Sequence, residues 1–101
     1  MIYSLTVPAA VPGVEEIRVL EWHGEPGKVF AVGDLIVELE THKAVVEARA
    51  GQPGVLRAIK ADPGEWREIG LVLALFSDSA DETLPEGDGS ATELVIEFDV
   101  I

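Results

Sequence analysis

The sequence predicts an all-β domain, a flattened barrel or sandwich. Short runs of β-forming residues follow one another along the chain, and glycine and proline mark the turns between them. No segment shows the periodicity of an amphipathic helix. A weak internal repeat, described below, predicts that the fold has two similar halves. With 101 residues, the chain has room for one small domain.

Eight runs are predicted to be strands. The first ends at Pro8, and the clearest alternates apolar residues (Leu35, Val37, Leu39) with Ile36 and two acids. Only three residues separate that run from the next, which predicts a tight hairpin between them. The predicted strands cover residues 2–7, 14–22, 28–30, 35–40, 44–48, 55–59, 66–67 and 71–76.

The internal repeat appears when the chain is shifted by 37 residues. Pro26-Gly27 then falls on Pro63-Gly64, Gly33 falls on Gly70, and apolar positions such as Leu35 fall on apolar positions. Each half contains a strand, a Pro-Gly turn, a short strand, a glycine turn and a strand. The repeat therefore predicts two similar sheets packed face to face with quasi-two-fold symmetry.

Composition excludes several classes of function. The chain has 7 Lys and Arg against 19 Asp and Glu, a net charge of -12, and binders of nucleic acid or anionic membranes need a basic surface instead. It has no cysteine, so disulfides, thiol nucleophiles and zinc–thiolate sites are ruled out. No apolar run approaches the ~20 residues of a membrane span and no signal-type leader is visible, so we expect a cytoplasmic location.

Composition also divides the chain. Residues 1–77 have the pattern of the folded domain, and residues 78–93, rich in Ser, Asp, Glu, Gly and Pro, are expected to form an acidic flexible linker. Residues 94–101 alternate apolar and acidic side chains, as an extra strand or the start of a missing segment would. An isolated strand is unstable in water, so this one is expected to pair with the edge of its own domain, with a second copy in a homodimer, or with a partner enzyme.

Lys43 is the residue that stands out chemically, because it lies near the tip of the predicted hairpin. A lysine exposed there is not desolvated, so it is no candidate for a low-pKa base, but it is accessible for covalent modification by another enzyme. Most lysines in hairpin turns only increase the solubility of the protein. The two histidines, His23 and His42, have no cysteine partner and no metal-ligand spacing, and no catalytic or metal-binding residue is predicted.

Several short motifs together resemble a known family. In chain order they are Glu21-Trp22, Gly27-Lys28-Val29, Gly33-Asp34-Leu35, Glu40-Thr41-His42-Lys43-Ala44, Gly54-Val55, Pro63-Gly64, Ile69-Gly70 and Leu73. In order and spacing they resemble the lipoyl domains of 2-oxoacid dehydrogenase acyltransferase subunits, in the biotinyl/lipoyl attachment family, over residues 1–77. The resemblance implies a flattened β-barrel of two four-stranded sheets with the modified lysine on an exposed hairpin.

The resemblance also implies a function. Lipoate would be amide-linked to Lys43 and act as a swinging arm, carrying acyl groups and electrons in a 2-oxoacid dehydrogenase complex, while the domain itself is no enzyme. Its partners would be a lipoate-protein ligase or lipoyl transferase, a thiamine-diphosphate 2-oxoacid decarboxylase and dihydrolipoyl dehydrogenase. The residues expected to guide modification are Glu40, Thr41, His42, Ala44 and the turn glycine Gly33, which the family places beside the hairpin.

Two alternatives stay open. His42 stands where the family usually has aspartate, which leaves room for a lipoyl-like module that is never modified and serves only in structure or interaction. A biotin carrier would share the fold, but its lysine is flanked by methionines. Met1 is the only methionine of this chain, so lipoate is favoured over biotin.

Overall fold

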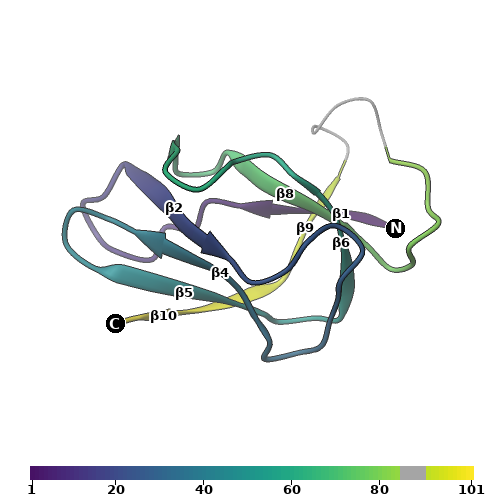
Figure 1. The fold of residues 1–101 in the computed structure, drawn as a ribbon. Helices are drawn as coiled ribbons and strands as arrows, with labels where there is room; N and C mark the ends of the chain where they lie inside the picture. The colour runs from purple at the N-terminus through teal and green to yellow at the C-terminus, as the bar shows by residue number, and fades with distance from the viewer. Residues whose placement is uncertain (85–90) are drawn as a thin grey trace.

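The computed structural model describes residues 1–84 and 91–101 and is an all-β sandwich, as the sequence predicts (Figure 1). Within these residues the strands form two five-stranded sheets. The strands are β1 (Ile2–Thr6), β2 (Glu16–Trp22), β3 (Val29–Phe30), β4 (Leu35–Glu40), β5 (Val45–Ala50), β6 (Gly54–Ile59), β7 (Trp66–Glu68), β8 (Val72–Ser77), β9 (Thr92–Glu93) and β10 (Ile96–Val100).

The two sheets enclose one apolar core. The first sheet has the order β3-β6-β8-β1-β9 and the second the order β10-β5-β4-β2-β7. Alternation along β5 puts one face of that strand inward, and β4, which has a register shift between Leu35 and Val37, buries both Ile36 and Val37. Burial of this apolar surface stabilises the fold. The largest fully buried side chains are Phe30, Phe76, Leu5, Ile17, Ile36, Leu39, Leu56, Leu73, Leu75, Val19, Val37 and Val46.

Backbone hydrogen bonds confirm the predicted quasi-two-fold symmetry. Gly27 N donates to Leu56 O at 2.7 Å, and Gly64 N donates to Val19 O at the same distance. The two bonds are equivalent under the repeat, because the donors are 37 residues apart and so are the acceptors. The turn glycines match as well: φ is +105° at Gly27 and +91° at Gly64, a region that side chains disfavour. The two halves therefore interlock, because the short strand of each half pairs with the sheet of the other.

The resemblance implied four strands a sheet, and the structure has five because the C-terminal residues add one to each. β9 lies parallel to β1, and β10 lies antiparallel to β5. Between them Leu94 is buried in the core at 4% exposure. The segment thus pairs with its own domain, one of the three expected arrangements. β10 begins at Ile96 rather than at residue 94.

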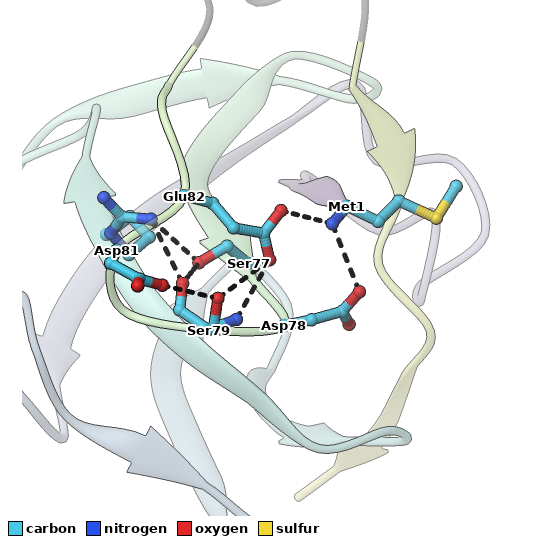
Figure 2. A network of polar contacts seen from close by, with 7 residues as sticks. Met1, Ser77, Asp78, Ser79, Asp81 and Glu82 are labelled. Carbon is cyan, nitrogen blue, oxygen red and sulfur yellow. Dashed lines mark hydrogen bonds and ion pairs between the residues drawn. The ribbon is translucent and has the colours of Figure 1, made fainter.

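The predicted acidic linker over residues 78–93 lies partly outside the described residues, which omit 85–90. Figure 2 shows the segment that follows β8: the amino group of Met1 contacts Glu82 and lies 3.2 Å from the Asp78 carboxylate. Ser79 N also donates to Glu82 Oε1 at 3.0 Å. This network ties the start of β1 to the chain leaving β8. Within residues 1–84 and 91–101, no helix has the length and apolarity to cross a membrane.

Candidate functional site

The β4–β5 turn, Thr41 to Ala44, is the candidate site. It projects from the end of the second sheet, opposite the amino terminus (Figure 1). Thr41 N donates to Ala44 O at 2.8 Å, which closes a two-residue loop made of His42 and Lys43. No described residue except glycine has a positive φ, which excludes turn types I′, II′ and II here and fits type I.

The Thr41 hydroxyl holds this turn together. Its Oγ1 accepts hydrogen bonds from Lys43 N at 3.0 Å and Ala44 N at 2.9 Å, and it lies 3.2 Å from Ala44 O, to which it can donate. Thr41 is only 4% exposed, so water does not compete for these bonds. A hydroxyl residue two positions before the lysine therefore fixes the backbone that presents the lysine.

Lys43 itself is exposed, and within the described residues no hydrogen bond or ion pair engages its Nζ. Its side chain extends toward the loop between β1 and β2. A Cβ added at Gly13 would lie 3.4 Å from Lys43 Nζ, and Gly13 has φ +79°. The glycine thus leaves space beside the amine. An unpaired, accessible amine fits acylation by another enzyme.

Glu40, one of the expected recognition residues, is held beside the turn by an arginine. Arg18 Nη2 lies 2.6 Å from Glu40 Oε1, and the guanidinium lies 5.8 Å from the centre of the Trp66 ring. Arg18 and Glu40 face each other across β2 and β4. This pair was not predicted from the sequence, where an arginine within a β run was the one available signal.

The surface beside the turn is acidic. A hollow of about 300 Å³ is lined by Gly13, Glu15, Glu16, His42 and Trp66. Glu15 and Glu16 are exposed and also line a second hollow with Glu68. Acidic side chains of this kind favour docking against a basic rim.

The structure groups some predicted site residues and separates another. Thr41, His42, Lys43 and Ala44 form the turn, and Glu40 directly precedes it. Gly33 lies at the other end of β4 and β5, where Gly33 N donates to Ala50 O at 2.7 Å. Its φ of +92° is the backbone reason for a glycine there. Gly33 therefore shapes the base of the hairpin, not the lysine-bearing tip.

Comparison with known proteins agrees with this geometry. The family model described as "Biotin-requiring enzyme", for biotin/lipoyl attachment domains, matches residues 4–76. The chain is 29% identical over 90 residues to the dihydrolipoyllysine-residue succinyltransferase component of the Bacillus subtilis 2-oxoglutarate dehydrogenase complex, covering 89% of this chain and 22% of that protein. The corresponding Cupriavidus necator component is 34% identical over 79 residues, covering 78% of this chain and 19% of that protein.

A third relative comes from a different complex. The mitochondrial protein X component of the Saccharomyces cerevisiae pyruvate dehydrogenase complex is 29% identical over 100 residues, covering 94% of this chain and 24% of that protein. The all-β fold, the exposed lysine in the turn and the family match are together those of a carrier-type attachment domain. The chain belongs to the biotin/lipoyl attachment family, and its homologues are components of 2-oxoacid dehydrogenase complexes. It spans about a quarter or less of the length of these three relatives.

Proposed function

We propose that this chain is a lipoyl carrier domain, with lipoate amide-linked to Nζ of Lys43. The observation that carries the proposal is the turn held by the Thr41 hydroxyl, which fixes the backbone of Lys43 while leaving the amine exposed and unpaired. Nothing is required of a carrier's own side chains beyond presentation, because the dithiolane of lipoate supplies the redox and acyl-transfer chemistry. The acidic surface around the turn would guide docking.

Lipoate fits the site better than biotin on the composition of the turn. The residues beside Lys43 are His42 and Ala44, and the only methionine, Met1, lies at the other end of the domain. The relatives come from both 2-oxoglutarate and pyruvate complexes, so the proposal covers the chemistry that these complexes share. The partners would be a ligase that attaches lipoate, a 2-oxoacid decarboxylase and dihydrolipoyl dehydrogenase.

Intact-protein mass spectrometry tests the proposal. The domain is incubated with lipoate, ATP and a lipoate-protein ligase, and in parallel with biotin, ATP and a biotin ligase. We expect a mass increase of one lipoyl group in the first reaction and none in the second. Lys43→Arg should abolish the increase without unfolding the domain.

Lys28→Arg is the matched control, since Lys28 is also exposed but its Nζ donates to His23 O at 2.8 Å. This variant should be modified like the wild type. A biotinyl mass instead of a lipoyl one would make the domain a biotin carrier. No modification by either ligase would support the unmodified interaction module.

A further inference from the structure

A second cluster of chemically capable side chains lies on the outer face of the second sheet, away from the Lys43 turn. Glu21 on β2 and Glu38 on β4 are direct partners across the antiparallel pair. His23 follows β2 directly, and its backbone is fixed on both sides: His23 N donates to Ile36 O at 2.8 Å, and Lys28 Nζ donates to His23 O at 2.8 Å. The backbone that carries the His23 imidazole is therefore fixed in position.

A register shift brings the two carboxylates together. Val19 pairs with Leu39, but the next pair is Glu21 with Glu38, so Leu20 is the extra residue of a β-bulge. Regular pairing would have set Leu20 opposite Glu38. Like charges directly opposite each other destabilise a sheet, and bulges are features that re-aim side chains. The bulge creates a repulsive pair that a cation would relieve.

In the described part of the chain, His23 is the basic group that lies within 4 Å of these acids. Its Nε2 lies 3.7 Å from Glu21 Oε2 and 3.6 Å from Glu38 Oε1. Both distances exceed those of a hydrogen bond. Nε2 is buried and has no hydrogen-bond partner, although the imidazole as a whole is 32% exposed. The ring thus turns its unsatisfied nitrogen toward the two carboxylates.

These separations suit three ligands of one metal ion. Bonds of about 2.0–2.2 Å in tetrahedral geometry place neighbouring ligand atoms roughly 3.3–3.6 Å apart. The three ligand atoms here lie within 4.8 Å of one another. Glu21 has a side chain that is 65% exposed, so it is free to move the remaining distance. One imidazole and two carboxylates form a donor set that zinc accepts.

We propose that Glu21, His23 and Glu38 form a binding site for one divalent metal ion of the zinc type. The bound ion would neutralise the Glu21–Glu38 pair and satisfy His23 Nε2. It would join β2 to β4, the strand that leads into the Lys43 turn. The metal site does not depend on lipoate, so it can be tested independently of the proposed carrier function.

Calorimetric titration of the metal-free, unlipoylated domain with Zn²⁺ tests the proposal. We expect one ion per chain, and at least a tenfold loss of affinity in both His23→Gln and Glu38→Gln. His42→Gln is the matched control, because His42 also adjoins exposed acids, Glu15 and Glu16. That variant should bind Zn²⁺ as the wild type does.

Two further measurements test whether the bound Zn²⁺ contacts His23. Zn²⁺ should shift the imidazole nitrogen resonances of His23 and leave those of His42 in place. It should also raise the melting temperature of the wild type but not of His23→Gln. Absence of binding, an equal loss of affinity in His42→Gln, or binding that leaves the His23 resonances unchanged would overturn the proposal.

Discussion

The Thr41 hydroxyl stabilises a two-residue hairpin loop that lacks the glycine or asparagine common in such loops. Such hairpins favour turn types with a positive φ, because the twist of those types matches the strands. This turn has no positive φ, and the Thr41 hydroxyl satisfies two of its amides instead. The requirement for a hydroxyl near the lysine is therefore one of backbone presentation.

Thr41→Val tests this role. Valine keeps the shape of the side chain but leaves the amides of Lys43 and Ala44 without their acceptor in a partly buried environment. We expect unfolding in urea to show a loss of about 1–3 kcal/mol, and ligase modification of Lys43 to slow. Thr41→Ser retains the hydroxyl and should stay close to the wild type in both measurements. A valine variant as stable as the wild type would contradict the role.

His42 is exposed and forms no hydrogen bond with a described side chain, so we expect it to contribute little to the stability of the fold. Replacing it with aspartate restores the residue usual in lipoyl domains. We expect His42→Asp to change the free energy of unfolding by no more than about 0.5 kcal/mol. A time course of intact mass with the lipoate ligase should show modification at least as fast as in the wild type. A much slower reaction would mean that the imidazole itself is recognised.

The C-terminal strands β9 and β10 form a clasp across both sheets. Glu93 pairs with Ser4 in one sheet and Val100 pairs with Val46 in the other, while Leu94 fills the core between them. β10 continues to the Lys43 turn, since Ile101 N donates to Val45 O at 2.8 Å. The segment therefore belongs to the same cooperative unit as the hairpin.

Leu94→Ala should show how much this clasp contributes. Removing a buried leucine side chain costs about 2–5 kcal/mol, which urea unfolding would detect. Val95→Ala is the control one residue away, because Val95 is 56% exposed and should lose only about 0.5 kcal/mol.

Deletion of residues 91–101 should lower the melting temperature while leaving Lys43 open to lipoylation. Equal stability of the leucine and valine variants, or an unchanged melting temperature after the deletion, would show that the clasp does not hold the fold.

The sequence was sufficient to predict most strands, including β10 within residues 94–101, but not β9 or the meeting of His23 with the two glutamates. Alternation and turn glycines are local signals, so the run at 35–40 and the Lys43 hairpin were predictable. β9 is two polar residues, Thr92 and Glu93, with no strand pattern of their own. The meeting of Glu21, His23 and Glu38 depends on a bulge, and a register shift leaves no mark in local periodicity.

The contacts of the Met1 amino group couple the stability of the domain to pH. The Glu82 side chain raises the pKa of the Met1 amine, and the amine lowers the pKa of Glu82. The amine's contribution is complete below its ordinary pKa and is lost as the pH rises through the raised value. The Glu82 contribution is present above its ordinary pKa and is lost as the pH falls through the lowered value. The stabilisation is therefore greatest between these limits.

Thermal unfolding of Glu82→Gln across a range of pH should reveal where this stabilisation is present. At neutral pH we expect the variant to melt below the wild type, and the difference should shrink in both strongly acid and alkaline buffer. Asp81→Asn is the control, because Asp81 accepts from Ser79 Oγ at 2.9 Å and makes no described contact with the amine. A pH-independent difference would assign the effect of Glu82 to its bond with Ser79 instead.

The quasi-two-fold axis makes the two ends of the sandwich equivalent in backbone terms. One end carries the Lys43 turn between β4 and β5. The other brings β8 beside β1, with Ile2 opposite Ser77 and Asp78 N donating to Met1 O at 3.2 Å. A circular permutant of residues 1–77, opened between His42 and Lys43 and closed by a short Thr-His-Lys-Ala loop from Ser77 to Met1, would keep every strand pair among β1 to β8. It would present its lysine from the opposite end of the sandwich, so the end that carries the lysine depends on which of two equivalent strand connections holds the turn.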